Sequence, residues 1–158
     1  MGTASTMNAM AEALGMSLPG CSAIPAPFRE RMSMAYFTGK RIVEMVKDNI
    51  TMSKIVTKKS FENAIKVNGA IGGSTNVMLH APELARAAGY REFTEDIITA
   101  AEFNHLSENI VPVIVNARPF GKYSMVDIDR IGGVQVLVRN LLDAGLLNGE
   151  AITCTGET

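Results

Sequence analysis

The residues best suited to hold a small ligand form the string GGSTN at positions 72–76. Paired glycines let the backbone approach a ligand closely, and exposed N–H groups at the start of a helix attract anions such as a carboxylate. The side chains of Ser74, Thr75 and Asn76 could add hydrogen bonds to hydroxyl groups. A tight turn followed by a helix N-cap needs the same residues, so the pattern leaves a binding role and a structural role open.

Two further polar residues are candidates for the same ligand. His80 follows Asn76 by about one helical turn, although a lone histidine at the start of a helix is more often structural. Lys122, in the loop RPFGKYSM, could pair with an anionic substrate, although a lysine in a surface loop is usually only solvated. The sequence contains no phosphate-binding loop or dinucleotide fingerprint, and these residues form no nucleophile–base pair. The motifs therefore predict an anion-binding turn and no complete catalytic site.

Metal-binding chemistry has few candidates in this chain. The two cysteines, Cys21 and Cys154, do not lie in a Cys-x-x-Cys pair and are too few for a disulfide scaffold. The two histidines, at 80 and 105, are far apart in sequence, so no zinc-type cluster is evident. We expect both cysteines to be ordinary buried or half-buried thiols, and we do not expect a metal site made by this chain alone.

Composition favours a globular protein of one domain. Of the 158 residues, 47% are apolar and 20% are charged, and the ten methionines suggest flexible core filling, with a methionine-lined ligand channel as the alternative. The net charge of −1 provides no basic surface for nucleic acid or an anionic membrane. The longest apolar run falls short of the roughly 20 residues of a membrane span, and the N-terminus does not resemble a signal peptide. These features predict a soluble, cytoplasmic protein.

Helical patterns cover most of the first half of the chain. We expect a helix that begins at Thr3 to Thr6 and ends before Pro19-Gly20, and a long helix over 28–49 with Pro27 in its first turn. A third helix, over 61–73, is expected to have Ser60 as its cap. The next helix is expected to be capped by Ser74 or Thr75, to kink or restart near His80 because of Pro82, and to end before Gly89.

The second half adds both helices and strands. A short helix is expected over 94–103, and a capping box at Ser124–Asp127 is expected to open a helix that is interrupted at Gly132-Gly133 and closed by Gly145. The β-branched run IVPVIVNA (110–117) predicts a buried strand, and AITCTG (151–156) predicts a final strand. Together the elements predict an α/β fold: a helix-rich, layered piece with a few parallel strands and no internal domain boundary.

Four strings become specific when they are taken together and in order. They are MGTASTMNAMAEALGMSLPG, KKSFENAIKVNGAIGGSTNVMLH, RPFGKYSMVDIDRIGGVQVLVRNLLDAGLLNG and ITCTGET. Their order resembles that of the dihydroxy-acid and 6-phosphogluconate dehydratase family over nearly the whole chain. The start MGTASTM, with SAIPA and GKRIVEMV after it, is more similar to the sugar-acid dehydratases of that family than to the branched-chain biosynthetic enzyme.

The resemblance implies a lyase that removes water from a 2,3-dihydroxy acid or a sugar acid and yields a 2-keto acid. In the family an iron–sulfur cluster acts as Lewis acid on the departing 3-hydroxyl, and Mg²⁺ holds the carboxylate and the 2-hydroxyl. The residues after Met1 would line the cluster side of the site, and the turn at Ser74, Thr75 and Asn76 would lie near the substrate. The last cluster cysteine would directly precede the first residue of this chain, and the other metal ligands would also lie outside it.

By the same resemblance, the chain is an internal portion of the family's large N-terminal α/β domain, without the swivelling β-rich C-terminal domain. Cys21 and Cys154 fall where the family needs no ligand. The resemblance also implies a homo-oligomer, a dimer or tetramer, in the full-length form, with a small hydroxy acid as its ligand. We expect the isolated chain to be inactive. The alternative is a truncated, non-catalytic module that binds a partner or a small acid.

Overall fold

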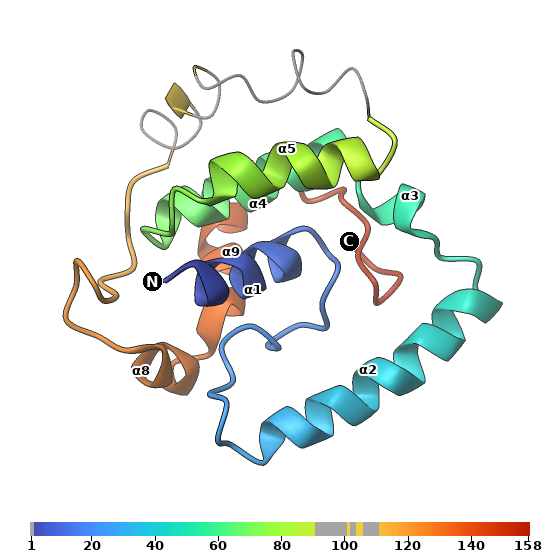
Figure 1. Ribbon diagram of the computed structural model, residues 1–158, viewed down its shortest axis with the longest axis horizontal. Helices are drawn as coiled ribbons and strands as arrows, with labels where there is room; N and C mark the ends of the chain where they lie inside the picture. Colours follow the sequence, from blue (N-terminus) through green and yellow to red (C-terminus); the bar gives the residue numbers. More distant parts are fainter. Residues whose placement is uncertain (1, 91–100, 102–103, 106–110) are drawn as a thin grey trace.

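A computed structural model describes residues 2–90, 101, 104–105 and 111–158 (Figure 1). The elements of regular secondary structure within these residues are all helices. They are α1 (Thr3–Ala13), α2 (Glu30–Lys47), α3 (Met52–Ile55), α4 (Lys58–Ala70), α5 (Val77–Ala87), α8 (Met125–Arg130) and α9 (Gly133–Asp143).

Helix α4 lies at the centre because it has apolar residues on two sides. Phe61, Ala64 and Ile65 join a core cluster with residues of α1 and α5. Val67 and Ala70 join a second cluster that contains residues of α8 and α9. A helix that is apolar on more than one face is suited to the interior of a helical domain. Figure 1 accordingly shows α4 surrounded by α1, α5 and α9.

The N-cap of α4 lies three residues before the predicted one. Thr57 is the N-cap: its hydroxyl accepts a hydrogen bond from the Ser60 N–H at 3.3 Å. Ser60 in turn accepts one from the Thr57 N–H at 2.8 Å, which completes a capping box. The expectation that Ser60 caps this helix was wrong because Ser60 occupies the third helical position and reaches back to the cap.

Helix α5 also differs from the prediction at its start. Its N-cap is Asn76, not Ser74 or Thr75, and Asn76 makes no side-chain capping bond. The helix includes Pro82 without restarting near His80, so the expected restart was wrong. The loss of one backbone hydrogen bond at a proline is evidently tolerated inside this helix. Gly89, with φ of +92°, does lie just past the helix end, as predicted.

The long helix α2 begins later than predicted and lies apart from the other helices (Figure 1). Two turns precede it, in which the Phe28 N–H donates to the Pro25 carbonyl and the Arg31 N–H donates to the Phe28 carbonyl. Pro27 therefore lies in these turns and not in the first helical turn. Only Met45 of α2 is buried. The Arg41 Nε donates to the Cys154 carbonyl at 2.6 Å and ties α2 to the C-terminal segment.

The predicted α/β fold was wrong: no strand or sheet occurs in the described part of the chain, which is helical. Within the predicted strand over 110–117, residue 110 lies outside the described residues. In the described rest of the run, the N–H groups of Ile114 and Val115 donate to the Ala70 carbonyl, and Ala117 and Tyr123 form one isolated bridge. β-branched residues favour a strand only where a neighbouring strand can pair with them.

The second predicted strand, over 151–156, is a turn. The Thr153 N–H donates to the Glu157 carbonyl, and the Gly156 N–H donates back to the Thr153 carbonyl. These bonds close the segment on itself and leave no ladder to a neighbour. The helix predicted over 94–103 lies outside the described residues, apart from residue 101, which is helical.

The predicted capping box at Ser124–Asp127 and the predicted glycine positions around α8 and α9 are confirmed. The Ser124 N–H and hydroxyl donate to one oxygen of Asp127 at 2.9 and 2.7 Å, which forms the predicted capping box. Gly132, with φ of +104°, separates the two helices, and Gly145, with φ of +71°, lies past the end of α9. Both glycines adopt a left-handed conformation that other residues rarely take. None of the described helices is long and apolar enough to cross a membrane.

Candidate functional site

The predicted ligand-binding string forms the turn between α4 and α5. The Gly73 N–H donates to the Asn68 carbonyl at 2.9 Å, and Gly72 has φ of +60°. A Cβ on Gly73 would lie 2.1 Å from Asn68 Oδ1 and 2.9 Å from the Thr6 methyl carbon. No side chain fits at that distance, so the turn needs glycine at position 73.

Two threonines of α1 fix the position of this turn. Thr6 is fully buried, and its hydroxyl oxygen accepts a hydrogen bond from the Ser74 N–H at 3.0 Å. The Thr3 hydroxyl oxygen accepts one from Asn76 Nδ2 at 2.7 Å and lies 3.2 Å from the Ser74 hydroxyl. Figure 1 shows the start of α1 beside this turn. Residues about 70 positions apart thus form one polar cluster, which we call the Thr3–Asn76 cluster: Thr3, Thr6, Ser74 and Asn76.

The backbone amides at the start of α5 are already engaged. The N–H groups of Val77 and Met78 donate to the carbonyls of Ser74 and Thr75 at 3.2 and 2.9 Å. Leu79 and His80 both donate to the Asn76 carbonyl, at 3.0 and 3.1 Å. The expected attraction of an anion to exposed N–H groups is therefore weaker here than the sequence suggested, because these donors are occupied.

The other predicted site residues are exposed. Thr75 and His80 are exposed, and His80 follows Asn76 by four residues, which places both on the same side of α5. Lys122 belongs to a separate loop, where its N–H donates to Asn116 Oδ1 at 3.1 Å and its ammonium lies 5.6 Å from the Tyr123 ring centre. The described contacts thus join Ser74 and Asn76 to each other and join neither to Lys122.

Sequence reasoning missed three residues that build this site: Thr3, Thr6 and Asn68. Asn68 is 6% exposed, and its Oδ1 is buried with no hydrogen-bond partner in the described structure. A buried polar atom without a partner is costly and marks a position where function or packing dominates. No local signal marks these residues, because Thr3 and Thr6 resemble ordinary residues near a helix start and the burial of Asn68 follows from tertiary packing.

The two cysteines behave as the sequence predicted. Cys21 is half-buried, with its Sγ 3.6 Å from a guanidinium nitrogen of Arg31. Cys154 is buried, and this burial raises the pKa of its thiol. A cluster or zinc ligand is a thiolate, so a raised pKa does not favour that role. Within the residues that the structure describes, no three His, Cys, Asp or Glu side chains come together as metal ligands would.

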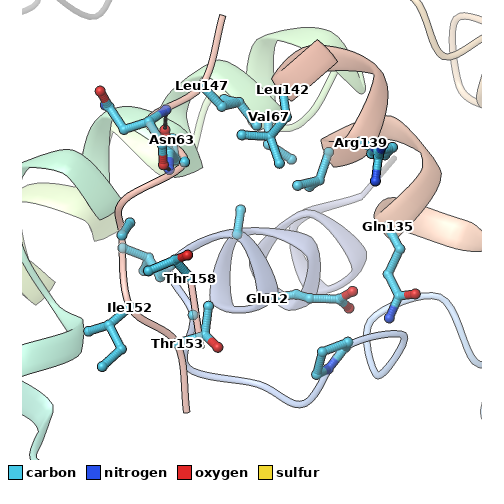
Figure 2. A pocket seen from close by; sticks show the side chains of 18 of the residues that line it. Glu12, Asn63, Val67, Gln135, Arg139, Leu142, Leu147, Ile152, Thr153 and Thr158 are labelled. Carbon is cyan, nitrogen blue, oxygen red and sulfur yellow. Dashed lines mark hydrogen bonds between the residues drawn. The ribbon is translucent and has the colours of Figure 1, made fainter. Parts of the chain in front are cut away.

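A cavity of about 300 Å³ lies between α1, α4, α9 and the C-terminal segment (Figure 2). Two of its polar lining residues, Glu12 and Asn63, have partners within the chain. The Glu12 carboxylate accepts hydrogen bonds from the N–H groups of Gly20 and Ser22, each at 2.8 Å. Asn63 exchanges two bonds with the backbone of Asn148, at 2.9 and 2.7 Å. This pairing gives Glu12 and Asn63 a structural role, and no predicted site residue lines the cavity.

A second cavity, of about 590 Å³, is lined largely by apolar side chains. Four of the ten methionines contribute to it: Met7, Met10, Met16 and Met52. Met10 is fully buried in the core, as core filling predicts. Met10 thus belongs to the core, as core filling predicts, and four methionines also line a cavity. A methionine-lined ligand channel stays a prediction.

Comparison with known proteins identifies the family. The family model described as "Dihydroxy-acid/6-phosphogluconate dehydratase N-terminal" matches residues 1–158. A dihydroxy-acid dehydratase of Leifsonia xyli subsp. xyli is 51% identical over the whole chain, which covers 27% of that relative. A D-xylonate dehydratase of Caulobacter vibrioides is 48% identical over the whole chain, which covers 25% of it. The chain thus spans about a quarter of the length of these relatives, and it belongs to the dihydroxy-acid/6-phosphogluconate dehydratase family.

Proposed function

We propose that this chain is part of a hydro-lyase that removes water from a 2,3-dihydroxy acid or a sugar acid and yields a 2-keto acid. The observation that carries the proposal is the family match over all 158 residues. Relatives at 51% and 48% identity are named for a dihydroxy acid and for D-xylonate. Both names describe the loss of water from a hydroxylated carboxylic acid, so the reaction class is common to them while the substrate differs.

The turn between α4 and α5 is our candidate for a substrate contact. Ser74, Thr75 and Asn76 carry hydroxyl and amide groups suited to a hydroxylated ligand, and His80 lies one helical turn further on. Lys122 is a second, separate candidate for the carboxylate of the substrate. The described residues offer no paired general acid and base in this turn, so we assign it to binding and not to proton transfer.

For the full-length enzyme we propose an iron–sulfur cluster and Mg²⁺ as cofactors. This chain does not fit as the source of the cluster ligands. It has two cysteines, of which Cys154 is buried with a raised thiol pKa, and the described residues bring no three His, Cys, Asp or Glu side chains together. We therefore propose that the ligands come from parts of the full-length protein outside these 158 residues, and that the isolated chain is inactive.

The proposal is tested by expressing the complete reading frame, reconstituting it anaerobically with iron and sulfide, and measuring 2-keto acid release. The acids assayed are a panel of aldonates, including D-xylonate, and 2,3-dihydroxyisovalerate. Turnover of one of them confirms the reaction class and identifies the substrate. The 158-residue chain, treated in the same way, is the matched control and is expected to give no product. No turnover and no cluster absorbance in the complete protein would favour a non-catalytic module that binds a small acid.

A further inference from the structure

The turn between α4 and α5 leaves a specific set of polar groups unused. The N–H of Thr75 has no hydrogen-bond partner within the described structure, and its exposed hydroxyl has none either. The side-chain oxygen of Asn76 has no hydrogen-bond partner among the described residues either, and its Nδ2 donates to Thr3. These three groups are one backbone donor, one hydroxyl and one amide acceptor, and they lie on consecutive residues.

We infer that Thr3 and Thr6 are positioning residues, which hold the turn so that Thr75 and Asn76 bind a hydroxyl group of the substrate and not its carboxylate. This inference rests on the proposed dehydratase function and adds to it the part of the substrate that the turn contacts. A hydroxyl group both donates and accepts a hydrogen bond. It can therefore accept from both the N–H and the hydroxyl of Thr75 and donate to the Asn76 side-chain oxygen.

Two observations favour a hydroxyl over a carboxylate. The amides of residues 77–80, which would bind an anion at the start of a helix, donate to the carbonyls of residues 74–76. The buried Oδ1 of Asn68 points at Gly73 and has no donor, so an uncompensated negative partial charge lies beneath the turn. A carboxylate would be repelled by this oxygen, whereas a neutral group that can donate would be attracted to it.

The positioning role follows from where the threonine bonds are made. The Thr6 hydroxyl fixes the backbone of Ser74, the residue before Thr75, and the Thr3 hydroxyl fixes the side chain of Asn76, the residue after it. The unused groups of the turn therefore lie between two anchored positions. Because Thr6 is fully buried, it cannot touch a ligand itself and acts only through the turn.

The test measures dissociation constants by calorimetry on the full-length protein. The probes are 2,3-dihydroxyisovalerate and D-xylonate, each with two analogues that lack either the 2-hydroxyl or the 3-hydroxyl. The variants are Thr75→Ala, whose side chain is exposed, and Thr6→Val, which removes the hydroxyl at nearly constant volume. Thr6→Ser retains the hydroxyl and is the matched control. Thermal melting establishes which variants are folded.

We expect Thr75→Ala and Thr6→Val to weaken binding of the dihydroxy acid by roughly three- to tenfold, which is the usual size of one neutral hydrogen bond. Binding of the analogue that lacks the contacted hydroxyl should be unchanged, and Thr6→Ser should behave like the wild type. Equal weakening for all the acids would overturn the inference, because it would mean that the carboxylate is bound or that the site is generally disturbed. If Thr6→Val does not fold, Thr75→Ala decides alone.

The outcomes separate this inference from the proposed function. Normal 2-keto acid release with unchanged dissociation constants in Thr75→Ala would overturn the hydroxyl contact and leave the dehydratase function standing. Absence of product with every acid would overturn the dehydratase function. Failure of the protein to bind any of the probes would overturn both.

Discussion

Helices α2 and α4 are both amphipathic in sequence, yet they have opposite environments. Eight of the 13 residues of α4 are buried, whereas one of the 18 residues of α2 is buried. Helix α4 packs between α1, α5 and α9, and its C-terminal end leads into the candidate site. Helix α2 contacts the rest of the chain through Met45 and Arg41 in its second half and through Arg31 near its start, which donates to the carbonyls of Cys21 and Ile24.

The contrast shows that apolar periodicity predicts a helix but not what the helix packs against. Met32, Tyr36, Val43 and Val46 of α2 are 77%, 70%, 55% and 76% exposed. Their spacing places them on one side of α2, opposite the buried Met45. Exposed apolar side chains in such a row are typical of a surface that another protein segment covers. Stability should therefore depend on α4, and association should depend on α2.

The largest expected effect comes from truncating a core side chain of α4. Phe61 is fully buried between α1, α4 and α5, and Phe61→Ala removes its ring and leaves a cavity. We expect a loss of about 3–5 kcal/mol in the free energy of unfolding, which is the usual range for such a change. Urea denaturation of the chain measures it. Phe37→Ala on α2, where the side chain is 54% exposed, is the matched control and should cost far less.

Replacing glycine with alanine should have opposite effects on the free energy of unfolding at two positions, Gly73 and Gly39. At Gly73 the new Cβ would lie 2.1 Å from Asn68 Oδ1, so Gly73→Ala should destabilise the chain by about 1–3 kcal/mol. At Gly39, inside α2, a Cβ would meet nothing within 4 Å. Gly39→Ala should therefore stabilise α2 by about 0.5–1 kcal/mol. Unfolding of both variants by urea tests this, and a stable Gly73→Ala protein would contradict the close approach.

These two regions also show what the sequence could predict. Local rules predicted the longer described helices, the capping box at Ser124–Asp127 and the break at Gly132, but not helix α3 or the N-caps at Thr57 and Asn76. The strand prediction over 110–117 failed, because a strand depends on a partner that the sequence pattern cannot supply. The described part of that run instead donates to the last carbonyl of α4.

The candidate site was predictable only in part. GGSTN was conspicuous because glycine pairs and hydroxyl residues are typical of turns that bind ligands. Its anchors, Thr3 and Thr6, lie about 70 residues away and were not predictable, because each looks like an ordinary residue near the start of a helix. Asn68 resembled a surface residue of α4, and its burial depends on the packing of α1 against α4. Bonds between distant segments follow from tertiary structure and not from local pattern.

A smaller effect is expected from the exposed side of α2. We expect the 158-residue chain to self-associate as its concentration rises, because the apolar side chains of α2 are in contact with water. Replacing Tyr36 and Val43 with serine should reduce this association and leave the urea midpoint nearly unchanged. Light scattering over a range of concentrations measures the effect. A wild-type chain that stays monomeric at high concentration would show that this surface does not drive association.

The smallest expected effect concerns the cap of α8, which lies away from both helices. Hydrogen bonds from the Ser124 N–H and hydroxyl, aided by the nearby Arg130 and Arg118, hold the pKa of Asp127 below its ordinary value of 3.8. A carboxyl whose pKa is depressed by folding binds its proton more readily in the unfolded chain. Its contribution to stability is therefore present above about pH 4 and is lost as the pH falls through the folded-state pKa.

Asp127→Asn should remove this contribution, so the difference in stability between the wild type and the variant should be present at pH 7 and shrink as the pH falls below about 4. Melting temperatures measured across that range test the prediction. Asp129→Asn is the matched control, since it removes a charge from the same helix two positions on and leaves the Ser124 bonds in place. If the difference in melting temperature between the wild type and Asp127→Asn stays constant with pH, the cap does not act through the charge of Asp127. That outcome would leave the comparison between α2 and α4 unaffected.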